Sequence, residues 1–421
     1  MDILKMGGPE GTGMVPTVTI RRWSDLMPGQ PQVDPRQAID DGVLLATDRW
    51  VGDEWFGLRF VMLTPLLGGM SAAVVRWLLW PTAEPDGVDP DESVPVLDVV
   101  GTCSLRLYSS CRELMDMVVA GIPSDWGPAT VAAAADDGFA QAVRAAQNAP
   151  RLRSEPGPWG YWPLTDVSST TWSRLADMNA DEWRSGPEDL RKDLLDLEFI
   201  DDTGELTTRG NIARHIRSRE AMRTHLDVWT ANRHARPLLI EHRGLCAVVR
   251  AAPAGPVDPG PRLNDSPRTS LGLMPAESVA EMICLGLRTS TRTMQVPASE
   301  PVHLETLVTH VLNGPGAEVE GTMLTSMRQA SAAVPWTLWR LSQDAVRSTP
   351  HDTAGAPLSF TILDAGPAGV FRLFRPEEPT EQEDHVVLAP WPGSEVLASL
   401  LEFFGCPGPP AQRTAESNRM R

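Results

Sequence analysis

The sequence is nearly devoid of lysine and contains few cysteines. Only Lys5 and Lys192 are lysines, so arginine supplies the other positive charges of the side chains, a bias that indicates a GC-rich genome. The cysteines are odd in number and form no C-x-x-C pair, which excludes the usual zinc and disulfide frameworks. They lie at positions 103, 111, 246, 284 and 406. The N-terminal stretch MDILKMGGPEGTG also lacks the basic-then-apolar order of a signal peptide. We therefore expect reduced thiols and a cytoplasmic protein.

Long hydrophobic runs are absent as well. The most apolar stretch, Phe60 to Val75, has 16 uncharged residues and is interrupted by Pro65 and by Gly68 and Gly69. A membrane-spanning helix needs about 20 consecutive apolar residues. The sequence therefore predicts no membrane span, and we expect this stretch to form a buried strand, a loop and a helix.

Motifs of catalysis and cofactor binding are missing too. The chain has no G-x-S-x-G elbow and no Walker A loop. His303 and His310 could share one helix face, but no carboxylate accompanies them at metal-ligand spacing. Asp201 and Asp202 are adjacent in a turn, whereas acid–base pairs are held apart across a cleft. We predict no catalytic residues, no cofactor and no metal, and hence a protein that is not an enzyme.

What the chain does contain is a large apolar fraction and a strong negative charge. Its 421 residues are 42% apolar, with a net charge of -18. The length suits two or three domains, and the charge disfavours nucleic acid as a partner because phosphates repel an anionic protein. Pro and Gly are dense between Ala149 and Pro163. We place a domain of unknown role at 1–149, a second region at 160–406 and a disordered tail at 407–421.

The second region opens with two predicted helices around a turn. PEDLRKDLLDL, Pro187 to Leu197, has leucines at helical spacing, and DDTG supplies a turn in which Gly204 can take positive φ. Thr207 or Thr208 can cap a second helix that ends near Met222. Strands are predicted next, followed by a helix. They cover LDVWT (226–230), LLIE (238–241), LCAVVR (245–250) and the helix 276–287.

The C-terminal part repeats this order. Leu358 to Leu363 and Val370 to Phe374 form a predicted hairpin, followed by a strand at 385–389 and a helix from Ser394 to Phe404. The repetition predicts an α+β fold in which antiparallel sheets with packed helices are pseudo-duplicated. The region between the copies, 304–346, is interpreted as helical.

A helix around VPWTLWRL would place Trp336 and Trp339 on one face. We name these two tryptophans as the candidate partner-binding residues, although tryptophans of this kind are also common in buried cores.

An arginine cluster supports an alternative function. Seven arginines between Arg209 and Arg236 face only two acidic residues, and such a cluster could neutralise phosphates. A winged-helix transcription regulator would then use the residues Arg209, Arg214, Arg217 and Arg223. A solvated helix face is the plainer explanation, since further strands follow where a wing would be expected. A structural or assembly subunit is a third alternative.

The segment from Gly160 to Phe404 resembles a known family in its order of elements. LLDLEFIDDTGELTTRG ends one helix and begins another, strands then end in RGLCAVVRA, and SFTILDAGPAGVFRLF with HVVLAPWPGSEVLASLLEFF completes the pattern. This order resembles the EspG family, cytosolic chaperones of mycobacterial type VII secretion. The resemblance implies two quasi-equivalent halves and a non-catalytic chaperone or adaptor that binds the apolar helical tip of a PE–PPE pair. Residues 1–149 have no counterpart in it.

Overall fold

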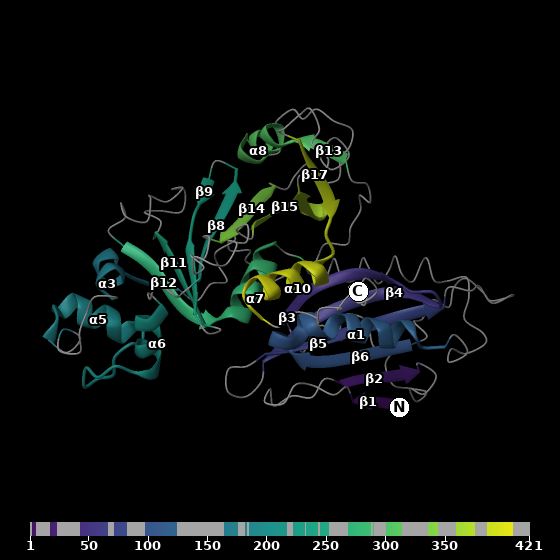
Figure 1. Cartoon of the computed structure of the whole chain (residues 1–421), viewed down its shortest axis with the longest axis horizontal. Coiled ribbons are helices and arrows are strands. Elements are labelled where there is room, and N and C mark those ends of the chain that lie inside the picture. Colours follow the sequence, from purple (N-terminus) through teal and green to yellow (C-terminus); the bar gives the residue numbers. More distant parts are fainter. Residues whose placement is uncertain are drawn as a thin grey trace, which may run out of the picture. The chain divides into compact units, whose positions relative to one another are not determined.

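The fold was analysed in a computed structural model of the whole chain. It describes residues 2–5, 17–22, 43–65, 71–81, 97–123, 164–175, 182, 185–216, 222–231, 233–242, 245–251, 268–287, 289, 300–313, 336–343, 359–374 and 385–406. The predicted tail at 407–421 and the boundary near 149–163 lie outside these residues. Mixed α+β architecture with antiparallel sheets, as the sequence predicts, is confirmed (Figure 1).

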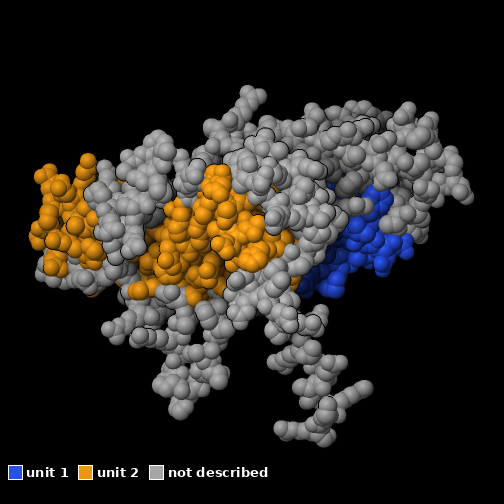
Figure 2. Space-filling model, turned by 90° about the horizontal axis from the view of Figure 1, so that it is seen from above, with its two compact units in different colours: residues 1–155, 288–293, 392–421 blue, residues 156–287, 294–391 orange. Residues whose placement is uncertain are grey.

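The chain divides into two compact units (Figure 2). Unit 1 consists of Met1–Glu155, Arg288–Thr293 and Pro392–Arg421, and unit 2 of Pro156–Leu287 and Met294–Trp391. The sequence assigned the helix near 394–404 to the 160–406 region. In the structure this helix belongs to unit 1, because its first turn binds strands near the N-terminus.

Unit 1 is built on a six-stranded antiparallel sheet with the order β1-β2-β6-β5-β4-β3. Its strands are β1 (Asp2–Lys5), β2 (Thr17–Arg22), β3 (Val43–Val51), β4 (Trp55–Pro65), β5 (Ser71–Pro81) and β6 (Leu97–Ser104). The predicted strand–loop–helix at 60–75 is wrong in its last part, since β5 is a strand. Apolar and polar residues do not alternate regularly along β4 and β5, because both faces of these strands are largely buried.

Two helices of unit 1 pack on one face of this sheet. They are α1 (Tyr108–Ala120), which follows the short η2 (Leu105–Leu107), and α10 (Gly393–Phe403). Trp55 and Trp77 lie fully buried in the sheet, and the Trp55 Nε1 donates to the carbonyl of Ile122 beyond α1. These tryptophans of the N-terminal part therefore belong to the core of unit 1.

A buried polar network fixes α10 to the sheet. Arg59 of β4 donates through Nη1 to Asp116 of α1 at 2.6 Å and through Nη2 to Asp48 of β3 at 3.3 Å. The same Nη2 donates to the Ser394 Oγ, and the Ser394 N–H donates to Asp48 at 3.1 Å. Burial alone would lower the pKa of Arg59, but the charges of Asp48 and Asp116 outweigh it and raise that pKa. The carboxylate of Asp48 also satisfies an N-terminal donor of α10.

Unit 2 contains one large antiparallel sheet with the order β13-β17-β16-β15-β14-β8-β10-β11-β12-β7, and β9 pairs with β8 beside this path. The first-half strands are β7 (Thr165–Ser168), β8 (Met222–Thr230), β9 (Arg233–Ala235), β10 (Leu238–His242), β11 (Leu245–Ala251) and β12 (Arg268–Pro275). The second-half strands are β13 (Glu300–His303), β14 (Thr337–Gln343), β15 (Ser359–Asp364), β16 (Val370–Phe374) and β17 (His385–Pro390), with η5 (Gly366–Ala368) between β15 and β16.

The two halves of this sheet have the same strand order when followed outward from the centre. In the first half, β8, β10, β11 and β12 form a meander, and the earlier strand β7 pairs with its last member. In the second half, β14, β15, β16 and β17 form a meander, and the earlier strand β13 pairs with its last member. The halves join through an antiparallel pair between β8 and β14 over six residues of each strand.

Helices pack on both sides of the first half of the sheet. They are α3 (Ser169–Arg174), α5 (Glu188–Asp196), α6 (Thr208–Ile216) and α7 (Ala276–Leu287), with α8 (Leu304–Asn313) in the second half. Figure 1 shows α5 and α6 on one side of β11 and β12 and α7 on the other. The predicted helix 276–287 is confirmed, whereas the helix predicted to reach Met222 is described from Thr208 to Ile216, and Met222 itself begins the strand β8.

The turn between α5 and α6 is held by side chains that bond to the backbone. The Asp201 Oδ1 accepts N–H bonds from Thr203 and Glu205, each at 2.9 Å, and these bonds, with the Thr203 hydroxyl first, lower the pKa of Asp201. Gly204 has φ of 84°, as the sequence predicts. The Thr207 Oγ1 accepts from the Gly210 N–H at 3.0 Å and so caps α6. This segment is a capped structural turn.

Candidate functional site

A strip of polar and aromatic side chains lies at the centre of the unit 2 sheet, where its two halves meet. We call it the central strip. Successive side chains of a strand alternate between faces, so every second residue of β8 belongs to one face. The central strip consists of Arg223, His225, Asp227, Trp229, His234, Arg236 and Arg340. Along β8 it extends over about 20 Å.

Asp227 organises the strip. The His234 Nε2 donates to the Asp227 Oδ1 at 2.9 Å, and the Arg236 Nε lies 3.4 Å from the same oxygen. The Asp227 side chain is 11% exposed, whereas those of His234 and Arg236 are 44% and 59% exposed. One nearly buried carboxylate therefore holds two outward-facing basic side chains in place.

Trp229 gives the strip an apolar surface. Its ring stacks on that of His234 with centroids 4.9 Å apart and parallel planes. Trp229 also packs against a buried cluster of the second half of the sheet. These two contacts restrict the rotamers of the indole, so binding would cost little further side-chain entropy.

Two more arginines complete the strip. Arg340 lies opposite Asp227 in the register of β14 with β8, and Arg223 precedes Asp227 on β8 on the same face of the sheet. Both side chains are exposed. The strip therefore has three arginines against one aspartate on a chain whose net charge is -18. Arginine with tryptophan at the centre of a surface is the composition of protein–protein hot spots.

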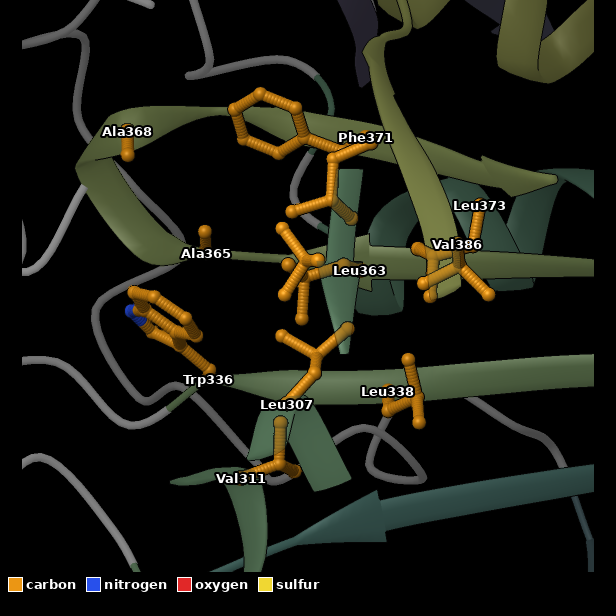
Figure 3. Close-up of a cluster of buried hydrophobic side chains, with 12 residues drawn as sticks. Leu307, Val311, Trp336, Leu338, Leu363, Ala365, Ala368, Phe371, Leu373 and Val386 are labelled. Atoms are coloured by element: carbon orange, nitrogen blue, oxygen red, sulfur yellow. The ribbon is translucent and has the colours of Figure 1, made fainter. Parts of the chain in front are cut away.

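The structure places Trp336 and Trp339 differently from the predicted exposed helix. The segment VPWTLWRL does not form a helix, since Thr337–Gln343 is the strand β14. Trp336 is 3% exposed and Trp339 is fully buried. Figure 3 shows Trp336 at the end of a cluster that includes Leu307 of α8 and Leu363 of β15. In this fold neither indole offers a surface to a partner.

The arginines of the alternative function are dispersed. Arg209 and Arg214 are exposed on α6, and Arg223 is on β8, while Arg217 lies outside the described residues. Arg209 also donates to the carbonyl of Leu273 at 3.2 Å and pairs with Glu198. The strand that follows α6 is hydrogen-bonded on both sides, so β8 is not a free wing. Among these residues only Arg223 belongs to the central strip.

The sequence analysis missed Asp227, Trp229, His234 and Arg340 as site residues. LDVWT was recognised as a strand, and its alternation alone places Asp227 and Trp229 on one face. The pairing of β8 with β14, which adds Arg340, joins residues about 110 positions apart and leaves no local pattern.

His303 and His310 both lie in or next to α8, and His310 contacts the ring of Trp336 with centroids 4.3 Å apart. No group of His, Cys, Asp or Glu suited to a metal ion occurs within the described part of the chain. All five cysteines are buried free thiols.

No protein-family model matches this chain, and no curated protein is significantly similar to it. Within the segments that the structure describes, no helix is both long and apolar enough to cross a membrane.

Proposed function

We propose that this protein is a non-catalytic, cytoplasmic chaperone or adaptor of the EspG type, which binds a helical protein partner such as a PE–PPE pair. The observation that supports this function best is the matched strand order of the two halves around the β8–β14 pair. Two quasi-equivalent halves joined in one sheet are what the EspG resemblance implies. A pseudo-duplicated origin of the halves is part of the same proposal.

We place the partner contact at the central strip. A secreted helical pair exposes an apolar tip, which aggregates unless another surface covers it. Trp229 supplies a rigid apolar centre, and Arg223, Arg236 and Arg340 surround it with positive charge. Such a surface selects a partner whose apolar tip is flanked by acidic residues. The partner surface thus differs from the tryptophan pair that the sequence suggested.

Co-expression with PE–PPE pairs from the same genome, followed by size-exclusion chromatography, tests this function. The wild-type chain should co-elute with one pair, and Arg340→Glu should weaken the complex about tenfold or more, since it reverses a central charge. Arg174→Glu is the matched control, because Arg174 is equally exposed on α3 and outside the strip. The function is refuted if the wild type co-elutes with no pair, and the placement is refuted if both variants bind alike.

The regulator alternative receives less support from the geometry. Of its arginines that the structure describes, Arg209 and Arg214 lie on α6 and Arg223 on a central strand, rather than on one recognition helix beside a wing. A gel shift with random duplex DNA at low salt distinguishes the two functions. Retardation that Arg209→Glu and Arg214→Glu abolish would favour the regulator over the chaperone.

A further inference from the structure

One helix covers the unit 2 sheet beside the Arg223 end of the central strip. Ile240 of β10 lies opposite Arg223 in the register with β8, so the two residues share one face of the sheet. Ile240 packs in a buried cluster with Ile216, at the end of α6. The α6 helix therefore covers this face next to Arg223.

A second helix covers the same face beside the other end of the strip. Leu338 of β14 lies opposite Trp229 and packs in the same buried cluster as Leu307 of α8. Trp229 packs against the border of this cluster and stays partly exposed. Arg223 and Arg340, which lie between the two covered regions, are exposed. The central strip is therefore flanked by a helix at each end.

The strip changes from apolar to basic along β8. Trp229 lies at one end, and two positions away Asp227 lies opposite Arg340. The Asp227 carboxylate is already paired with His234, so the positive charge of Arg340 is directed to other groups only in part. Arg223 lies at the far end of β8. Since a strand rises about 3.3 Å per residue, Arg340 and Arg223 are about 7 Å and about 20 Å from Trp229 along the strand.

We propose that the partner contributes one helix, which lies along β8 and completes the helical layer between α6 and α8. Its apolar end contacts Trp229, and two acidic side chains further along it meet Arg340 and Arg223. A helix is the occupant that fits this place, because helices cover the face on both sides, and exposed arginines select negative charge.

The proposal fixes the spacing of the charges on the partner. A helix rises about 1.5 Å per residue, so the two distances correspond to about 4 and about 14 residues from the apolar end. At about 3.6 residues per turn, both positions lie on the same face of the helix as the apolar residue. This inference rests on the proposed function and specifies the partner that the central strip accepts.

Fluorescence anisotropy of labelled helical peptides with the full chain at low salt tests this spacing. The spaced peptide carries leucines at one end and glutamates about 4 and about 14 residues further. In the compressed peptide the second glutamate moves to about 7 residues, on the same helix face. Each peptide is made in both chain directions. The wild type should bind the spaced peptide about fivefold more tightly, because a second ion pair forms.

Charge reversals assign each glutamate to its arginine. Arg223→Glu should abolish the preference for the spaced peptide, and arginine at the distal peptide position should restore binding to this variant. Arg340→Glu should be compensated only by arginine at the nearer position. Arg174→Glu is the control, because Arg174 is exposed on α3 outside the strip, and it should keep the wild-type preference. A general effect of net charge does not depend on the position of the compensating arginine.

Three results overturn this arrangement: equal binding of both peptides by the wild type, binding of neither, or compensation at either position alike. If the wild type then still co-elutes with a PE–PPE pair, the proposed function stands and only the placement of the helix is wrong. If the peptides bind as expected but no pair co-elutes, the arrangement stands and the EspG-type function is refuted.

Discussion

Replacing Arg59 with methionine should destabilise unit 1 selectively. Arg59 bonds β3, α1 and α10 at the same time, through Asp48, Asp116 and Ser394. Methionine keeps the apolar stem but removes the charge, so the buried carboxylate of Asp48 loses its ion pair. Breaking a buried pair on one side costs about 3–5 kcal/mol. For a unit of this size the loss corresponds to about 10 °C in Tm.

Urea unfolding measures this loss of stability. Hydrogen exchange of peptides from α1 and α10 then shows whether the loss lies within unit 1. Arg106→Met is the control, because Arg106 is an exposed arginine of the same unit, and its replacement should change stability by less than about 0.5 kcal/mol. The double variant Arg59→Met, Asp48→Asn should lose less unfolding free energy than the two single variants together, because it no longer contains the unpaired Asp48 carboxylate. A loss below about 1 kcal/mol for Arg59→Met, or full additivity, would refute the role of the network.

Three further predictions concern the rest of the fold. Burial raises the pKa of Glu281 from 4.5 to about 7, so the folded state retains a proton that the unfolded state releases. The unfolding free energy should therefore fall as pH rises from about 4.5 to 7, and Glu281→Gln should be more stable than wild type at pH 8 by about 2 kcal/mol in urea titrations. Thr207→Ala should lower the free energy of unfolding by about 1 kcal/mol, because the cap of α6 is lost. Gly210→Ala should lower it more, because the added Cβ would lie 2.0 Å from the Phe199 carbonyl oxygen. Thermal melts that rank the two variants in the opposite order would contradict this turn geometry. The five buried thiols should react with a thiol reagent only after denaturation, and a fast native reaction of any one would contradict its burial.

Local patterning predicted several elements whose apolar residues recur at the period of a helix or a strand. The helices 276–287 and 394–404 have apolar residues at helical spacing, and both are present as α7 and α10 with shifts of at most one residue. Leu358, Phe360 and Ile362 alternate with polar residues, and this strand is also present. In α7 the sequence period reports directly which face meets the core, whereas most residues of α10 are buried and both Ile362 and Leu363 of β15 are buried.

The pattern was misleading where both faces of a strand are buried. Leu338 and Trp339 are neighbours in β14 and are both buried, so the alternation of buried and exposed residues is interrupted at the start of this strand. Leu338 and Leu341, like Trp336 and Trp339, are three positions apart, a spacing that also suits a helix. The position of α10 could not be predicted either, because Asp48 and Ser394 are 346 residues apart and only tertiary contact joins them.

The dependence of unit 1 on α10 has a consequence for synthesis on the ribosome. Asp48 and Arg59 leave the exit tunnel early, but the serine that completes their network follows the last strand of unit 2 in the chain. The N-terminal sheet must therefore wait, with one side of β3 uncovered, while more than three hundred residues are translated and the second sheet forms.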